Sequence, residues 1–376
     1  MKGRTILGAA VVAALFAAPN AETGQIVENP ARPTSPDAGR VVKIAEEWRI
    51  TDEGAAFFLD RPHSIQPAGD GSIFLVDRDQ ILRFSAEGKF LKNILRLGQG
   101  PGEVTPQRGG ARPYLLVQGY DLYISDTASK RCWRTDLDGR LGEEFSVPRS
   151  DRPGLIGVIK EGLLFWKLFF PPRRDPVDGR ELISKGEFID LPQTLTVAAW
   201  ERGKEKDIFT VTNRTFVSPR MTYPAHMTAA LSPDGRRFYF VLGLEYLVQE
   251  VDLASGTVVR KFKRACQRVP PPPRKPLEGR AAQVNEEDRR KGWLPPDPEF
   301  LADVPGLRVV GDLLWVSTST RDEVKGTLID VFDREGRYVD CFWTGKSWGP
   351  VYDGFVFCSE KGPDAAVSVV KYKIVK

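Results

Sequence analysis

Six times along the chain, a tight turn that contains glycine leads into a short run of β-branched and aromatic residues. Glycine supplies the positive φ that a two-residue hairpin turn needs, and the residues that follow suit a pleated strand. The six openings are Gly71 before SIFLV, Gly119 before YDLYIS, Gly162 before LLFW, Gly235 before RRFYFV, Gly311 before DLLWV and Gly354 before FVFC. A hairpin that recurs through the whole chain predicts a radial β architecture, and it indicates no particular chemistry.

A second strand-like run follows each opening, and in most units another glycine turn and a further strand come after it. With the segment before each opening, every unit is expected to contain four antiparallel strands. The shorter spacings between openings match the blade of a β-propeller, which has about 40–50 residues. The two longer spacings predict insertions at 171–186 and 269–303, and the polar segment 280–291 of the second suits a short helix. The prediction is therefore an all-β, six-bladed β-propeller of four-stranded antiparallel blades.

The sixth unit reaches the end of the sequence with three strands, while VVKIAEEWRI at 41–50 is a strand without a partner. We expect this N-terminal strand to complete the last blade, because pairing removes an edge that invites aggregation. Residues 41–376 then form the propeller, and 22–40 are expected to be a flexible lead-in. A β-sandwich, or two separate all-β domains, is the competing interpretation. Two domains predict a linker near the midpoint, yet the repeat continues through 190–265.

The first residues have the pattern of a secretory signal peptide, assigned to 1–21. Lys2 and Arg4 precede an apolar stretch at 6–18, and small residues follow at the expected cleavage position. An uncleaved anchor is the alternative, although the stretch is shorter than the about 20 residues of a bilayer span. The prediction is an exported protein, periplasmic or extracellular, with no membrane span after cleavage. The net charge of +4 is too small to indicate a nucleic-acid partner.

The stretch VDRDQILRFSAEGKFLKNILRLGQGPGE at 76–103 resembles the bacterial six-bladed β-propeller family related to NHL repeats. The Pro-rich, charged insertion at 269–303 is also similar to that family, whereas Val104 stands where the family has an aromatic residue. The resemblance implies the fold and, often, export, but no shared activity, because propellers serve many functions. The matching positions are Asp77, Ile81, Phe84, Gly88, Phe90 and Leu91, followed by the loop Gly98, Gln99, Gly100, Pro101, Gly102 and Glu103.

That loop lacks the Lys-Ser/Thr ending of a phosphate-binding P-loop and does not open a helix. It follows an outer strand and leads to the next inner strand, where the chain has to cross the blade. Its turn-forming residues suit that route. We therefore predict a structural loop, with ligand binding as the alternative.

Both predicted insertions belong to connections that share one face of a propeller, and elaborated loops on a regular scaffold are where binding resides. Arginines in the connections of this face suit carboxylate, phosphate or sulfate groups, unless they are solvated or paired with nearby acids. Two histidines begin innermost strands in opposite blades, and two tryptophans lie in loops, where they suit stacking on a sugar or peptide. The candidate ligand-binding residues are Arg61, His63, Arg108, Arg112, Arg152, Arg220, His226, Trp293 and Trp348.

The four cysteines fit no zinc or haem motif. Cys341 and Cys358 fall on strands of neighbouring units, so they are the candidate pair for a disulfide in an exported protein. Buried free thiols are the alternative.

No catalytic residue, metal site or cofactor is predicted, because no local motif of a nucleophilic or metal-dependent enzyme is present in the sequence. The favoured function is an exported binding propeller whose loop-bearing face takes a peptide, glycan or protein. The alternatives are a metal-dependent hydrolase or lyase with ligands in the central channel, and a structural module of an envelope complex.

Overall fold

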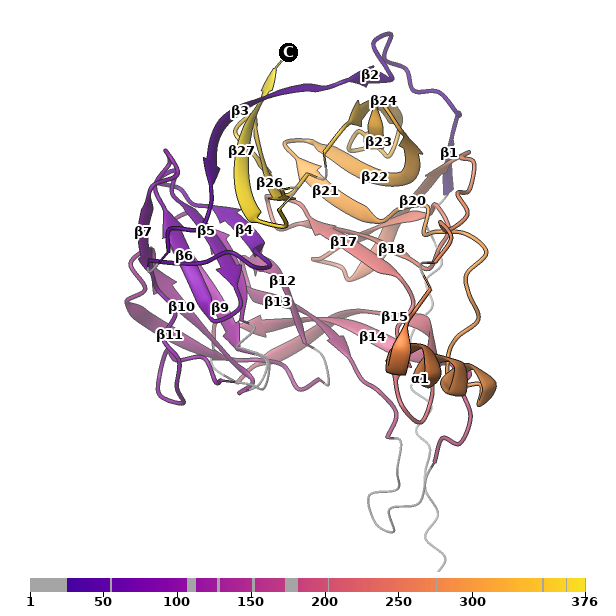
Figure 1. Cartoon of the computed structure of the whole chain (residues 1–376), viewed down its shortest axis with the longest axis horizontal. Helices are drawn as coiled ribbons and strands as arrows, with labels where there is room; N and C mark the ends of the chain where they lie inside the picture. Colours follow the sequence, from indigo (N-terminus) through magenta and orange to yellow (C-terminus); the bar gives the residue numbers. More distant parts are fainter. Residues whose placement is uncertain are drawn as a thin grey trace, which may run out of the picture.

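The computed structural model describes residues 26–54, 56–106, 113–126, 129–150, 153–172, 182–201, 203–274, 276–346, 348–362 and 364–375. These residues form six β-sheets arranged in a ring (Figure 1). Each blade is built on four antiparallel strands in consecutive order from the centre outward, and three of the sheets carry a fifth, short strand at their outer edge. One blade takes its outermost strand from the other end of the chain. The predicted all-β, six-bladed β-propeller is confirmed.

The first three blades use strands that are consecutive in the chain. Blade 1 consists of β4 (His63–Pro67), β5 (Ile73–Asp77), β6 (Gln80–Phe84) and β7 (Phe90–Asn93). Blade 2 consists of β8 (Tyr114–Gln118), β9 (Asp121–Asp126), β10 (Arg131–Asp136) and β11 (Leu141–Ser146). Blade 3 consists of β12 (Gly154–Ile159), β13 (Gly162–Leu168), β14 (Glu187–Ala199), β15 (Glu205–Val217) and the short β16 (Thr222–Tyr223).

The remaining blades involve the N-terminal segment as well. Blade 4 consists of β17 (Met227–Leu231), β18 (Arg237–Leu242), β19 (Val248–Asp252) and β20 (Thr257–Arg264), with β1 (Ile26–Asn29) parallel to β20. Blade 5 consists of β21 (Gly306–Val310), β22 (Leu313–Asp322), β23 (Gly326–Phe332) and β24 (Tyr338–Thr344), with β2 (Arg40–Val41) parallel to β24. Blade 6 consists of β25 (Val351–Tyr352), β26 (Phe355–Lys361), β27 (Val367–Val375) and β3 (Lys43–Ile50).

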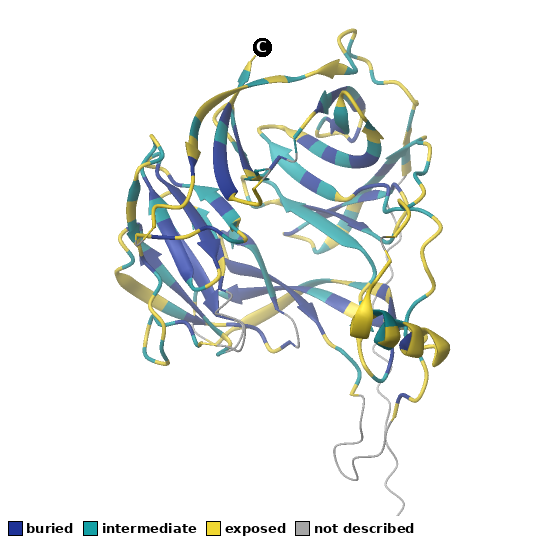
Figure 2. Cartoon of the chain, in the orientation of Figure 1, coloured by how far each residue is buried: buried dark blue, intermediate teal, exposed yellow. Residues whose placement is uncertain are grey.

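The hydrophobic core is divided among the junctions between blades. Each buried cluster joins two consecutive blades, as where Trp166 stacks on Phe238 across 5.6 Å, or where Phe262 meets Phe332 across 5.0 Å. Both faces of a blade are therefore covered, which explains why β5 and β13 are buried at every position (Figure 2). Sheets covered on both faces need continuous apolar runs instead of alternation, which is the pattern that follows each opening glycine.

The ring is closed as the sequence predicted, because β3 pairs antiparallel with β27 from Ile50 opposite Val369 to Lys43 opposite Val375. The segment before β3 differs from the expected flexible lead-in at 22–40. Its residues 26–41 run along the outer edges of blades 4 and 5 and contribute β1 and β2 there. The unpaired edges of β20 and β24 provide backbone partners that the sequence pattern did not reveal.

The predicted signal peptide at 1–21 lies outside the described residues. Within the part of the chain that the structure describes, no helix has the length and apolar character to cross a membrane.

The two insertions meet on one side of the ring. Part of the first, 173–181, lies outside the described residues, but the backbone N–H of Gly186 donates to the carbonyl of Gly292 in the second across 3.0 Å. The second contains α1 (Gly279–Arg290), which confirms the predicted helix, and α1 is mostly exposed beside β14 and β15 (Figures 1 and 2). We call the face that carries these connections the insertion side, and the opposite face, which carries the hairpin turns, the hairpin side.

Candidate functional site

Two cavities adjoin blades 4 and 5, one on each face of the ring. The hairpin-side cavity has a volume of about 420 Å³ and is lined by turns such as 232–237 and 311–314. The insertion-side cavity has a volume of about 1080 Å³, and residues of the second insertion form part of its wall. Their sizes and charge patterns differ, and that difference identifies the better candidate.

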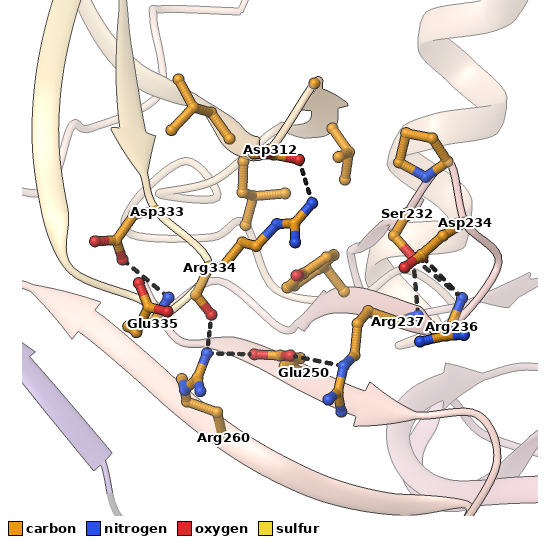
Figure 3. Close-up of a pocket in the computed structure, with 16 residues that line it drawn as sticks. Ser232, Asp234, Arg236, Arg237, Glu250, Arg260, Asp312, Asp333, Arg334 and Glu335 are labelled. Atoms are coloured by element: carbon orange, nitrogen blue, oxygen red, sulfur yellow. Dashed lines mark hydrogen bonds and ion pairs between the residues drawn. The ribbon is translucent and has the colours of Figure 1, made fainter.

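Most charged side chains of the hairpin-side cavity are paired with one another (Figure 3). Glu250 accepts from Arg260 across 3.0 Å and lies 3.4 Å from Arg237, while Arg334 pairs with Asp312. Burial raises the pKa of Glu250, although the Arg260 and Arg237 guanidinium groups oppose that rise. Because Arg260 also donates to the backbone carbonyl of Arg334, the network links blade 4 to blade 5. The charged residues around this cavity are therefore accounted for by the contacts that connect blade 4 to blade 5.

The insertion-side cavity has two chemically different walls. The second insertion and the start of blade 5 contribute an apolar wall, formed by Val269, Pro270, Pro272, Leu301, Ala302 and Pro305. The strands of blade 5 contribute hydroxyl groups, from Ser317, Thr318, Ser319, Thr320, Thr327 and Thr344. Four cationic side chains also line the cavity, namely Arg268, Arg308, Arg321 and Lys346, and its described lining contains no aspartate or glutamate.

Arg308 is the partly buried cation of this cavity for which the described residues provide no carboxylate partner. It lies on β21, the innermost strand of blade 5, where Leu307 packs into the cluster between blades 4 and 5. Successive side chains of a strand point to opposite faces, so Arg308 is directed toward blade 6. There its Nη2 donates to the carbonyl oxygen of Trp348 across 2.6 Å. Burial lowers the pKa of Arg308, but a guanidinium keeps its charge in a protein.

Two of the other cations are paired with carboxylates that do not themselves line the cavity. Arg268 Nε lies 3.3 Å from Asp303, and Lys346 Nζ lies 2.5 Å from Glu360. Burial disfavours the charged form of Lys346, but hydrogen bonds with Glu360 and Tyr372 outweigh burial and raise its pKa. The positive character of the cavity therefore comes from Arg308 and from the exposed Arg321.

Two residues predicted from the sequence reach this cavity. His226 lines it, and its Nε2 donates to the carbonyl of Val304 across 2.8 Å. Trp348 also lines it but is only 8% exposed, since its ring lies 5.8 Å from Trp315 and 5.6 Å from Phe342. Trp348 therefore packs mainly against these two protein rings, and the stacking of a ligand on it stays a prediction.

The structure places the other described candidates away from this cavity. Arg61 has an 81% exposed side chain, and His63 is exposed with Nδ1 3.2 Å from the carbonyl of Arg61. Arg220 donates to both carboxylate oxygens of Asp288 on α1, across 2.7 and 2.6 Å. Trp293 donates to a carbonyl of the first insertion, that of Ser184, across 3.3 Å. Arg108, Arg112 and Arg152 lie outside the described residues.

The loop from Gly98 to Glu103 is held together by its own contacts. The Glu103 carboxylate accepts from the backbone N–H of Gly100 across 2.8 Å and occupies the space that a Cβ at Gly98 would need. Arg131 donates to the carbonyls of Gly100 and Glu103, each across 3.1 Å. Val104, at the position where the family that the sequence resembles has an aromatic residue, is fully buried. These contacts support the structural role predicted for the loop.

The predicted disulfide is not formed, since Cys341 and Cys358 are both free thiols. Cys341 packs into the cluster between blades 4 and 5, whereas Cys358 packs into the cluster between blades 5 and 6. The next residue on the strand, Phe342, is the one that faces blade 6. The prediction that the two cysteines lie on neighbouring blades is correct, but their side chains do not face each other.

Among the described residues, no group of three or more His, Cys, Asp or Glu side chains is arranged to hold a metal ion. Arg308 is not among the candidate residues predicted from the sequence. The signal was the pattern GLRVV at 306–310, in which one charged residue interrupts an otherwise apolar inner strand.

No family model matches the chain, and no curated protein matches it. The chain is similar to a Bacteroides fragilis protein thought to be exported, with 10% identity and a TM-score of 0.49 over 94% of this chain and 100% of that one. It is similar to a DUF4221 family member from Bacteroides vulgatus, with 11% identity and a TM-score of 0.49 over 90% and 99%. It is also similar to a gluconolactonase from Xanthomonas campestris, with 15% identity and a TM-score of 0.41 over 91% and 99%.

These likenesses carry no information on the activity of this chain, and the fold assignment depends on its own sheet topology. The specific resemblance to the NHL-related family remains a prediction.

Proposed function

We propose that the protein is an exported binding protein that holds its ligand in the insertion-side cavity. The observation that carries the proposal is the contrast between the two cavities. The buried carboxylate of the hairpin-side cavity, Glu250, is paired with two arginines, whereas the insertion-side cavity contains a partly buried guanidinium with no carboxylate partner among the described residues. Its volume of about 1080 Å³ suits a small ligand or the end of a larger one.

The position of the cavity also supports the proposal. It lies where the second insertion leaves blade 4 and returns to blade 5, so an elaborated loop and the regular scaffold share one wall. Loops positioned by a rigid scaffold are common sites of binding. The proposed partner is a peptide, a glycan or a protein, and a terminal group of that partner would enter the cavity.

The test is a thermal-shift screen of a library of peptides, saccharides and small metabolites. Wild type is compared with Ala302→Trp, which fills the insertion-side cavity, and with Leu313→Trp, which adds the same bulk at the hairpin side. The proposal predicts compounds that raise the Tm of wild type and Leu313→Trp but not that of Ala302→Trp. Compounds that stabilise all three proteins equally, or a library with no compound that separates them, would contradict it.

The same screen also tests the alternative of a metal-dependent hydrolase or lyase. A stabilising compound that is converted, with conversion stopped by a chelator and restored by a divalent ion, would establish that alternative in place of a binding protein.

A further inference from the structure

The chemistry of the insertion-side cavity narrows the class of ligand, provided that the proposed function holds. The apolar wall consists of proline and aliphatic side chains, including Pro270, Leu301 and Pro305. Such a surface offers few groups to a sugar or to a fully charged metabolite. It favours a molecule with an apolar part, since removing apolar surface from water stabilises a complex by about 25 cal/mol per Å².

The opposite wall has the reverse character. Arg308 uses one of its N–H groups on the carbonyl of Trp348, and no ion pair or second hydrogen bond connects its guanidinium to the described residues. A guanidinium has five N–H donors in a fixed fork. A partly buried charge that is not paired costs free energy, which an anion entering from solvent would recover.

Neighbouring groups extend this polar wall. Gly306 lies two residues before Arg308 on β21, and Ser317 lies opposite Gly306 on the neighbouring strand β22. A Cβ at Gly306 would lie 3.5 Å from the Ser317 hydroxyl oxygen, so glycine leaves the space beside that hydroxyl open. An oxyanion held by Arg308 therefore has a hydroxyl donor close by.

From these walls we propose that the ligand is an amphiphile with an apolar body and an oxyanion head, the head bound by Arg308. Carboxylate and phosphate can each present two oxygens to two N–H groups of the guanidinium, which binds them in a bidentate manner. The apolar body lies against the wall formed by the second insertion. Binding involves no covalent step.

The experiment is isothermal titration calorimetry of the full chain with octanoate, octyl phosphate and octylamine, which share one tail and differ in the head group. Octanoate or octyl phosphate is expected to bind, and octylamine at least about tenfold more weakly. The comparison of the two acids identifies whether the head is a carboxylate or a phosphate. Acetate and inorganic phosphate, which have no tail, are expected to bind at least about tenfold more weakly than the matching amphiphile.

Variants assign the binding to the predicted residue. Arg308→Met is expected to weaken the better acid at least about tenfold, and Arg308→Lys, which keeps the charge but not the fork, to weaken it less. Arg236→Met removes one exposed cation from the hairpin side and serves as the matched control, with binding unchanged. If Arg308→Met lowers the Tm strongly, the affinity of Arg308→Lys and the comparison of head groups on wild type still test whether Arg308 binds the head.

The inference is overturned if octylamine binds as tightly as the acids, or if the Arg308 variants bind like wild type. A failure of every octyl compound, together with a library compound that Ala302→Trp excludes, would overturn this inference alone and leave the binding function standing. If no compound of either kind depends on the cavity, both proposals fail.

Discussion

The indole Nε1 of Trp48 donates a hydrogen bond to the carbonyl oxygen of Ala86 across 2.9 Å. Trp48 lies on β3, the outermost strand of blade 6, and Ala86 lies in the turn between β6 and β7 of blade 1. A Cβ at Gly88 would approach the Trp48 ring to 3.0 Å, so the glycine turn also fits closely against this ring. The strand that completes blade 6 therefore holds blade 1 as well.

Removing β3 is expected to destabilise the whole ring. A variant that begins at residue 51 loses the β3–β27 ladder and the Trp48 contact, whereas one that begins at residue 40 keeps both and loses β1. Thermal unfolding followed by circular dichroism should show a large fall in Tm, or no cooperative transition, for the first variant. The second should melt much closer to the full chain. Equal Tm values for all three would contradict closure by β3.

Asp330 and Arg264 form a buried ion pair between blades 4 and 5, with Arg264 Nε 2.6 Å from the Asp330 carboxylate. The carboxylate also accepts from the hydroxyls of Tyr246 and Tyr338, across 2.7 and 2.8 Å. Asp330→Asn leaves the guanidinium without its counter-charge, so the free energy of unfolding in urea should fall by about 3–5 kcal/mol.

The control is Asp312→Asn, which breaks a pair whose aspartate side chain is 74% exposed and should change stability by less than about 1 kcal/mol. Similar losses in the two variants would show that burial of the Asp330 pair has no energetic weight.

Glu360 should make stability depend on pH on the acid side. Burial opposes its ionisation, but hydrogen bonds from Lys346 and Tyr372 outweigh burial and lower its pKa below the ordinary value of 4.5. Because the folded state favours the carboxylate, this stabilisation is complete above pH 4.5 and is lost as the pH falls through the lower, folded pKa. Glu360→Gln should therefore be less stable than wild type at neutral pH, by about 1 kcal/mol.

The difference should narrow as the pH falls below 4.5, and urea unfolding across the acid range measures it. Glu299→Gln, which changes an exposed carboxylate on the second insertion, is the control and should follow wild type. A constant difference between Glu360→Gln and wild type at every pH would contradict the account.

The four cysteines should behave as free thiols that folding protects. Burial raises the pKa of Cys132 to about 12 and that of Cys358 to about 11. A thiol reagent at mildly alkaline pH should react first with the partly buried Cys266 and reach all four thiols only after unfolding. A reductant should leave the Tm unchanged. A count of two thiols in the unfolded, unreduced protein would indicate a disulfide instead.

The sequence predicts the fold well because each blade repeats the same local chemistry. The glycine turns, the apolar run after each of them, and the lone strand at 41–50 are all local features, and the structure joins them as expected. The edge pairing of β1 and β2 was not predictable in this way. Those strands are short, and their partners are more than 230 residues away in the sequence.

The candidate site was harder to predict from the sequence than the fold, because it depends on the direction in which side chains point. One residue of register decides that Phe342 faces blade 6 and Cys341 faces blade 4, and a composition pattern does not give that register. Trp348 lies in a loop, as predicted, but its ring packs against those of Trp315 and Phe342. Arg308 becomes a candidate for binding only when the structure shows that no acid among the described residues lies beside it.

The central claim, that the insertion-side cavity holds a ligand with an oxyanion head at Arg308, is tested most directly by a crystal structure of the protein grown with octanoate. The account predicts density for the carboxylate within hydrogen-bonding distance of the Arg308 guanidinium, and for the tail against Leu301 and Pro305. Density for octanoate elsewhere, with the cavity holding only water, would contradict it.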